Sequence, residues 1–218
     1  MNKTIKSLTA FLMALALAGC SSATPTSNTD GSKPTAPAQQ ETAEEGTEEL
    51  IAETVYVEME IENYGTVKLE LDGAAAPITV TNFVNLVNDH FYDGLTFHRI
   101  MDGFMVQGGD PTGTGVGGSS KTIKGEFAQN GVDNPISHKT GVISMARNSI
   151  SMDSASSQFF ICVADDEFLD GAYAAFGHVT EGMDVITKIA KDAKPVDDNG
   201  TIKPEEQPII KTMKVVEG

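Results

Sequence analysis

A short stretch of the sequence, Phe97–Asp110, gathers the side chains best suited to chemistry. It contains Arg99 and Gln107, which exchange hydrogen bonds but are not nucleophiles. Phe104 and Met105 supply apolar surface beside them. This combination favours a pocket that holds an apolar group beneath one strong hydrogen-bond donor. Taken singly, each residue also fits a half-buried strand with a solvated arginine on its rim, which is where most arginines lie.

Later segments decide between these interpretations. Ser144–Arg147 is followed by Ser154–Cys162, then by Phe168–Gly171 and Tyr173–Gly177. Together with FHRIMDGFMVQGGD, these segments resemble the signature blocks of the cyclophilins, which are peptidyl-prolyl cis-trans isomerases. The resemblance runs from about Thr54 to the C-terminus. The blocks FHRI, GFMVQGGD and SSQFFI are highly specific in this order and spacing.

The resemblance implies a mainly β fold, a closed eight-stranded antiparallel β-barrel capped by two α-helices, with the pocket on its outer wall. It implies catalysis by Arg99, with Gln107 and Phe104 beside it, and it implies no cofactor and no metal. The residues implied to contact the substrate form a larger set: Met105, Gly115, Ala146, Arg147, Gln158, Phe160, Phe168, Leu169 and Tyr173.

Three positions depart from the family's common pattern. Arg147 stands where many cyclophilins have asparagine, so a backbone contact with the substrate survives but a side-chain contact is in doubt. Tyr173 replaces a common histidine and still donates a hydrogen bond. Phe168 replaces a common tryptophan and lacks the indole N–H. The resemblance therefore implies weak cyclosporin binding, with less effect on catalysis.

The pattern of apolar residues predicts the main elements independently of the resemblance. Alternation over Val55–Ile61 and Val67–Leu71 predicts a β-hairpin. Pro77 begins a helical stretch with an apolar stripe at i, i+3, i+4 and i+7. A second helix is expected over Glu181–Lys191 with Thr180 as its N-cap. Further strands are expected over four ranges and at the C-terminal end: Thr96–Ile100, Phe104–Gln107, Gly141–Ala146, Phe159–Val163 and Ile209–Val216. Many short strands with two isolated helices favour a closed barrel.

The N-terminal segment has the features of a targeting signal. Residues 1–19 have the basic start and short apolar run of a secretory signal peptide, and Leu17–Cys20 resembles the lipobox of bacterial lipoproteins. The resemblance implies lipid attachment to Cys20, which predicts an extracytoplasmic lipoprotein on the outer face of the cell membrane or in the outer membrane. A plain signal peptide with a chance cysteine is the alternative. Residues 20–52, polar and acidic after the cysteine, predict a disordered tether, and 53–218 the folded domain.

Composition and the remaining motifs exclude other classes of protein. The formal net charge of −16 argues against nucleic-acid binding. Gly113–Gly118 matches G-x-G-x-x-G, but no helical pattern follows, so a flexible loop is expected rather than a dinucleotide site. The four histidines lack metal-ligand spacing, and the serines at 154, 156 and 157 lack a nucleophile elbow. Cys162 is expected to be a buried, inert thiol.

The sequence thus predicts a monomeric peptidyl-prolyl isomerase that acts on proline-containing peptides and unfolded secreted proteins. A non-catalytic module that captures proline-containing segments, as a chaperone or an adhesin, is the main alternative. Retention of Arg99, Phe104, Gln107 and Phe160 favours catalysis, because capture alone does not need the arginine. A nucleotide-dependent oxidoreductase rests on the glycine loop alone.

Overall fold

The computed structural model describes residues 49–218, which fall within one compact unit, Thr47–Gly218. The predicted signal peptide, Cys20 and most of the predicted tether lie outside the described residues. The tether was predicted to extend to residue 52, but Ile51 already packs against the core, and its N–H donates to Thr81 Oγ1 at 2.8 Å. Order therefore begins slightly before the predicted boundary. Within the described part of the chain, no helix is long and apolar enough to cross a membrane.

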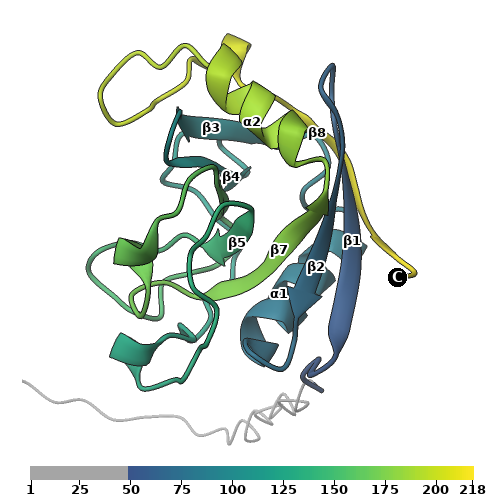
Figure 1. Ribbon diagram of the computed structural model, residues 1–218, viewed down its shortest axis with the longest axis vertical. Coiled ribbons are helices and arrows are strands. Elements are labelled where there is room, and N and C mark those ends of the chain that lie inside the picture. The colour runs from purple at the N-terminus through teal and green to yellow at the C-terminus, as the bar shows by residue number, and fades with distance from the viewer. Residues whose placement is uncertain (1–48) are drawn as a thin grey trace, which may run out of the picture. The chain divides into compact units, whose positions relative to one another are not determined.

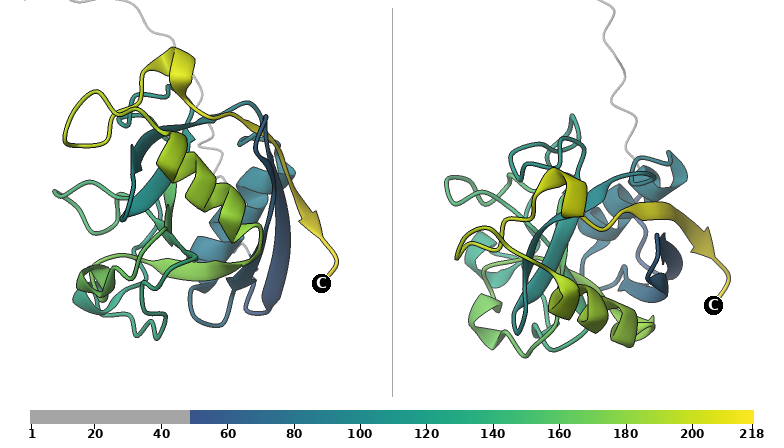
Figure 2. Two further views of the ribbon diagram at one scale, coloured as in Figure 1. Left: turned by 45° about the horizontal axis from the view of Figure 1, so that its top comes forward. Right: turned by 90° about the horizontal axis from the view of Figure 1, so that it is seen from above.

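One antiparallel sheet of eight strands curls around the core (Figures 1 and 2). Its spatial order is β3-β4-β6-β5-β7-β2-β1-β8. The strands are β1 (Thr54–Ile61), β2 (Gly65–Asp72), β3 (Thr96–Met101), β4 (Met105–Asp110), β5 (Val142–Met145), β6 (Phe159–Cys162), β7 (Ala175–Glu181) and β8 (Ile210–Val216). This confirms the predicted mainly β fold with eight antiparallel strands and two helices.

The two end strands of the sheet meet over a short distance. Thr96 and Ile209 form an isolated bridge, and Gly94 N–H donates to the carbonyl of Ile210 at 2.7 Å. Ile210 N–H in turn donates to the carbonyl of Leu95 at 2.8 Å. The curled sheet is therefore joined between β3 and β8 by a few hydrogen bonds rather than by a full ladder.

Helix α1 (Pro77–Asn88) begins at the predicted proline and presents its apolar stripe to the core. Its N-cap, Ala76, has no side-chain acceptor, so the first N–H groups need a partner from elsewhere. Buried Glu126 supplies it: its carboxylate accepts from the N–H of Ile78 at 3.0 Å and from that of Thr79 at 2.7 Å. A negative charge at this end also suits the helix dipole.

Helix α2 (Met183–Asp192) begins later than the sequence pattern predicted. Glu181 belongs to β7, where it pairs with Lys68 of β2. The N-cap is Gly182 rather than Thr180, with φ of +85°. A Cβ at position 182 would come within 2.4 Å of the Thr66 carbonyl oxygen, so the close approach of the chain to β2 selects glycine.

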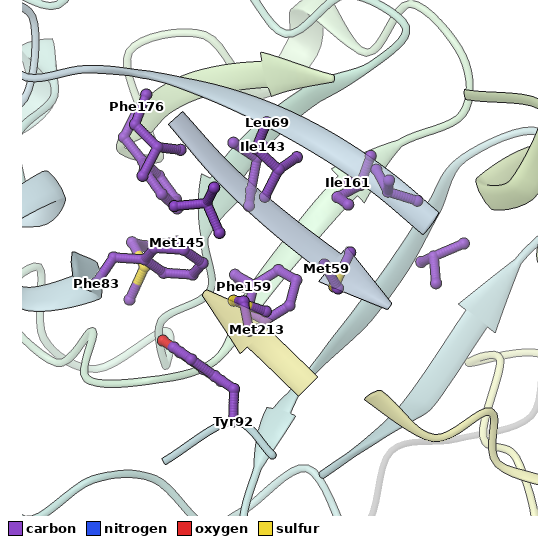
Figure 3. Packing of buried hydrophobic residues seen from close by; sticks show 14 of the residues in the cluster. Met59, Leu69, Phe83, Tyr92, Ile143, Met145, Phe159, Ile161, Phe176 and Met213 are labelled. Carbon is purple, nitrogen blue, oxygen red and sulfur yellow. The ribbon is translucent and has the colours of Figure 1, made fainter. Parts of the chain in front are cut away.

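The core lies inside the curl of the sheet, between the two helices (Figures 1 and 3). Phe83 of α1 is fully buried, with its ring centroid 5.0 Å from that of Tyr92 and 5.6 Å from that of Phe159. Burial of each such ring contributes about 1.5–3 kcal/mol to stability. Because strand side chains alternate between faces, Phe159 and Ile161 of β6 fill this core while Phe160 and Cys162 lie on the outer face.

Candidate active site

Strand register places two of the predicted catalytic residues, Arg99 and Gln107, in one row across the outer face with Phe160, which was predicted to contact the substrate. Arg99 of β3 lies opposite Gln107 of β4, and Gln107 lies opposite Phe160 of β6. Directly opposed residues in an antiparallel pair share a face and stand about 4.5–5.5 Å apart. The sheet thus brings together three side chains from three strands without help from any flexible loop.

Hydrogen bonds to Asn199 and Gln107 and a contact with the Phe104 ring hold the guanidinium of Arg99 in place. Its Nε donates to the carbonyl oxygen of Asn199 at 2.7 Å, and its Nη1 donates to Gln107 Oε1 at 3.1 Å. The same group lies over the Phe104 ring, 5.9 Å from the centroid. Partial burial lowers the pKa of Arg99, whereas Tyr173 and Asp197 act in the opposite direction. An arginine remains charged at neutral pH, so it is a fixed cationic donor.

A chain of amide hydrogen bonds orients Gln107. Its Nε2 donates to Gln158 Oε1 at 2.9 Å. Gln158 Nε2 donates to the carbonyls of Gly117, at 2.7 Å, and Gly115, at 3.1 Å. This chain fixes the Gln107 amide so that its oxygen faces Arg99, and it ties the glycine-rich loop to the site.

Beside Arg99 the outer face is hollowed into a pocket of about 120 Å³. Its apolar residues include Met105, Phe160 and Leu169, all buried. Tyr173 stands edge-on to Phe160, with ring centroids 5.9 Å apart. The complete lining is Arg99, Phe104, Met105, Gln107, Ala146, Arg147, Phe160, Leu169 and Tyr173. The pocket suits a small apolar ring with a cationic donor at its edge.

A second cavity, of about 310 Å³, adjoins the pocket at Gln107, Ala146 and Arg147. Gly115 and Gln158, also predicted to contact the substrate, line it. The pocket and this cavity together account for all but one of the predicted site residues. Two larger hollows exist among the described residues. One of about 400 Å³ beside α1 has no arginine or aromatic side chain in its lining, and one of about 480 Å³ shares Arg99 and Gln107 with the pocket.

The side chain of Arg147 braces the rim. Its Nε donates to the carbonyl of Ala172 at 2.9 Å, and its guanidinium lies 4.9 Å from the centroid of Tyr173 and 5.2 Å from that of Phe127. These contacts engage the guanidinium within the protein. They agree with the expectation that the backbone at this position, rather than the side chain, is available to a peptide.

Phe168 is the predicted substrate-contacting residue that lines neither the pocket nor the adjoining cavity. Its side chain is 72% exposed, and its ring packs against Phe104 with centroids 5.6 Å apart. It precedes Leu169 in a short 3₁₀ turn, Glu167–Leu169. Leu169 points into the pocket while Phe168 stands on the rim.

Behind Phe160 lies a polar network, made of buried His138 and Ser144 and exposed Asp170, that was not predicted from the sequence. His138 stacks on the Phe160 ring, with centroids 6.0 Å apart and planes 14° apart. Its Nδ1 lies 2.8 Å from Asp170 Oδ1 and its Nε2 lies 3.0 Å from Ser144 Oγ. Hydrogen bonds lower the pKa of Asp170, although burial opposes them. Asp170 is then a carboxylate that accepts from Nδ1, while Nε2 and the Ser144 hydroxyl share the second hydrogen bond.

The hydrogen bonds link Asp170 to His138 and His138 to Ser144, as in the triad of a serine hydrolase. The location of the three residues excludes that role. Ser144 has no exposed surface, and the His138 ring lies beneath Phe160. A nucleophile must reach a substrate carbonyl, and this hydroxyl cannot. The network instead supports the floor of the pocket. The spacing of the histidines could not predict this network, because its members meet only in the folded chain.

The glycine-rich loop is built around Asp110. The carboxylate accepts from the N–H groups of Thr112, Gly115 and Gly117 at 2.8, 2.6 and 3.1 Å. Burial acts to raise the pKa of Asp110, but these hydrogen bonds outweigh it and lower the pKa to about 2. The chain continues from Gly118 without a helix, so the arrangement required of a dinucleotide site is absent from residues 110–127.

Two further side chains near the site, those of Cys162 and His98, are buried. Cys162 is fully buried, and burial together with nearby carboxylates raises its pKa to about 12, as expected of an inert thiol. His98 is buried, and neither of its ring nitrogens has a hydrogen-bond partner within residues 49–218. In that same range no three histidine, cysteine or acidic side chains gather as metal ligands.

Comparisons with known proteins agree with this geometry. Residues 56–215 match the family described as cyclophilin type peptidyl-prolyl cis-trans isomerase/CLD. A peptidyl-prolyl cis-trans isomerase of Helicobacter pylori is 46% identical over 144 residues, which cover 65% of this chain and 84% of that protein. Peptidyl-prolyl cis-trans isomerase B of Bacillus subtilis is 45% identical over 124 residues, 57% of this chain and 82% of that protein.

The chain belongs to the cyclophilin family. A solved cyclophilin from Cryptosporidium parvum superposes with a TM-score of 0.67 at 29% identity, covering 76% of this chain and 99% of that one. The structure described as that cyclophilin in the presence of the dipeptide Ala-Pro gives a TM-score of 0.66 at 29% identity, covering 75% and 99%. The resemblance inferred from the signature blocks is thereby confirmed for the fold and the family.

Within this cyclophilin, the residues of the signature blocks gather from distant parts of the chain. Arg99, Gln107 and Phe160 come from three strands, and Leu169 and Tyr173 come from the segment before β7. Asn199, whose carbonyl holds Arg99 from 100 positions away, was not identified from the sequence. Its contribution is a backbone oxygen, which any residue type provides, so no residue pattern could identify this contact.

Proposed function

We propose that this cyclophilin accelerates rotation about X-Pro bonds in secreted or surface polypeptides, with Arg99 as the catalytic residue. The observation that carries the proposal is the guanidinium of Arg99, fixed by Asn199 and Gln107 at the edge of an apolar pocket. The solved relative with the dipeptide Ala-Pro supports a proline-containing ligand.

The chemistry requires no covalent step. An X-Pro bond rotates through a twisted state in which amide resonance is lost, and unaided rotation takes tens to hundreds of seconds. In the twist, the proline nitrogen gains a lone pair. A donor directed at that nitrogen stabilises the twisted state more than either planar state, which is the condition for catalysis. Arg99 is such a donor, because its charge is permanent and its planar group is held in one direction.

The pocket and its neighbouring cavity divide the substrate between them. Met105, Phe160 and Leu169 receive the proline ring, with Phe104 and Tyr173 at the sides. We place the residues before the proline along Ala146, Arg147 and Gln158, where Gln107 joins the pocket to the cavity. There an extended peptide finds backbone hydrogen-bonding groups, as in strand-like recognition.

The test is a proline isomerisation assay of the protein and of Arg99→Ala. Loss of one transition-state donor should lower kcat/KM about 10²–10³-fold. Arg99→Lys is the matched variant: it retains the charge without the planar fork, so its activity should remain well below wild type. Wild-type turnover by a folded Arg99→Ala protein would refute the role of Arg99.

We also propose a location. The lipobox-like Leu17–Cys20 and the polar segment that follows support a lipid-anchored enzyme outside the cytoplasm, whose clients are newly exported chains. The alternative, capture without catalysis as a chaperone or adhesin, leaves the fixed guanidinium unexplained. It predicts that Arg99→Ala binds proline peptides as tightly as wild type, while neither protein isomerises them.

A further inference from the structure

The most exposed large apolar side chains of residues 49–218 are Val116 at 90%, Ile150 at 94% and Phe168 at 72%. The other large apolar side chains that reach the surface there are only 38–54% exposed: Leu50, Met152, Val196, Ile209 and Val215. Single exposed apolar side chains are ordinary, but an apolar group gathered at one place with a polar surround marks an interaction surface. The question is therefore whether the three lie together.

Two of them belong to loops that contribute residues to the lining of the same cavity. Val116 is part of the lining of the 310 Å³ cavity, between two glycines whose carbonyls accept from Gln158. Ile150 lies in a turn closed by Asn148, whose Oδ1 accepts from the N–H of Ile150 at 2.9 Å. Asn148 N–H donates to Ser154 Oγ at 3.1 Å, and both residues line the cavity. Val116 thus lines the cavity itself, and Ile150 lies in a turn whose Asn148 belongs to the same lining.

The third residue stands beside the proline pocket. The ring of Phe168 packs on Phe104, which lines that pocket and lies beneath the Arg99 guanidinium. Val116 borders the cavity, Ile150 lies in a turn held by two residues of its lining, and Phe168 borders the pocket. A peptide that crosses from the pocket into the cavity would therefore pass apolar surface at both places.

The fold itself does not require these side chains. The turn at Ile150 is closed by the Asn148 and Ser154 side chains, and the glycine-rich loop is held by Asp110 and Gln158. Neither loop depends on packing of its apolar residue, since both side chains are about nine-tenths exposed.

We propose that Val116, Ile150 and Phe168 form an apolar rim that captures unfolded polypeptide with apolar side chains flanking the proline. The occupant follows from continuity: the rim borders the pocket and cavity to which an X-Pro segment is assigned, so the inference rests on the proposed function. An extended chain advances about 3.3 Å per residue, so residues a few positions from the proline reach the rim. Folded proteins bury such side chains, which makes unfolded chains the fitting partner.

The experiment uses Val116→Ser/Ile150→Ser and two labelled peptides with the same Ala-Pro centre, one flanked by alanines and one by leucines. Affinity is measured by fluorescence anisotropy and turnover by the isomerisation assay. The wild type should bind the leucine-flanked peptide about tenfold more tightly. The double variant should lose that preference. Ile150→Ser alone, outside the cavity lining, should keep turnover of the alanine-flanked peptide within about twofold of wild type. Val215→Ser, an exposed apolar position on β8, is the matched control and should retain the preference.

Persistence of the leucine preference in the double variant would overturn the rim, as would equal binding of both peptides by wild type. Equal loss of turnover on both peptides would also overturn it, because the rim would then belong to the pocket. Absence of turnover in wild type would refute the proposed function alone, since the anisotropy comparison still decides the rim. As a second measurement, a reduced and carboxymethylated unfolded protein should compete with the labelled peptide less well in the double variant.

Discussion

Two arginines at the site show how surroundings decide what one side chain can do. The Arg147 guanidinium lies over two aromatic rings and donates to Ala172, so it braces the rim. The Arg99 guanidinium bonds to Asn199 and Gln107 and faces the pocket. Because catalysis requires a donor directed at a developing lone pair, only Arg99 has the position for it. Under the proposed mechanism, the same residue type therefore serves structure at one edge and chemistry at the other.

Position 168 allows a test of whether this residue sets the affinity for cyclosporin. Phe168→Trp would add an indole N–H and a larger ring beside Phe104. We expect tighter cyclosporin binding, by about 1–2 kcal/mol for one net hydrogen bond and added ring contact. Peptide turnover should change much less, because Arg99 and Gln107 are untouched. Inhibition titrations of both proteins give the comparison. Equal, tight inhibition of the two would show that position 168 does not set drug affinity.

Cys162 gives a prediction about reactivity. Its thiol is buried, and burial with the neighbouring carboxylates raises its pKa to about 12. The thiolate is the reactive form, so iodoacetamide should not modify Cys162 in the folded protein at pH 8. Mass spectrometry of a Cys20→Ser variant, in which Cys162 is the only cysteine left, should show modification only after denaturation. Rapid modification of the native protein would mean that the apolar cluster around Cys162, formed with Met105, Phe160 and Leu169, opens readily.

At the scale of elements, the glycine-rich loop depends on one carboxylate. Asp110 is 1% exposed, and hydrogen bonds from the loop lower its pKa from 3.8 to about 2. A pKa that is lower in the folded state stabilises the protein above the unfolded-state value, and this contribution disappears as the pH falls toward the folded-state value. At about 1.4 kcal/mol per pKa unit, Asp110 contributes about 2 kcal/mol at neutral pH, which is lost between about pH 4 and pH 2.

Asp110→Asn should accordingly lower the free energy of unfolding by about 2 kcal/mol at pH 7 and change it little near pH 2. Urea unfolding at the two pH values measures both quantities. Asp133→Asn, at an exposed position, is the control and should behave like wild type at both. The same loss for Asp110→Asn at pH 2 and pH 7 would assign the effect to packing rather than to charge.

The elements that could be predicted are those whose residues carry a local pattern. Alternation identified the β1–β2 hairpin, and Pro77 with its apolar stripe identified α1. Strand β7 was not predicted, because its first part is buried on both faces and its last part is exposed, so no alternation marks it. The start of α2 was wrong because Glu181 pairs across the sheet with Lys68. Long-range pairing overrode a reasonable local capping pattern.

At the scale of the molecule, the signature blocks identified most of the pocket, but not what holds it. Arg99, Gln107 and Phe160 could be predicted because their neighbours in sequence resemble a known family. The Asn199 carbonyl and the His138, Ser144 and Asp170 network could not, because these contacts join segments that only the curled sheet brings together. A sheet that spans the whole domain thus positions both the catalytic donor and the support behind the pocket.

The remaining prediction concerns where this molecule works. Cys20 follows a lipobox-like sequence, outside the residues that the structure describes. One acyl chain gives only marginal membrane binding, whereas two or more give stable anchoring. Expressed in a bacterium, the wild-type protein should therefore sediment with membranes. Cys20→Ser placed behind a plain cleavable secretory signal should appear in the soluble extracytoplasmic fraction with the same isomerase activity. If that cleaved variant still sediments with membranes, a contact made by the domain itself, rather than a lipid on Cys20, holds the protein there.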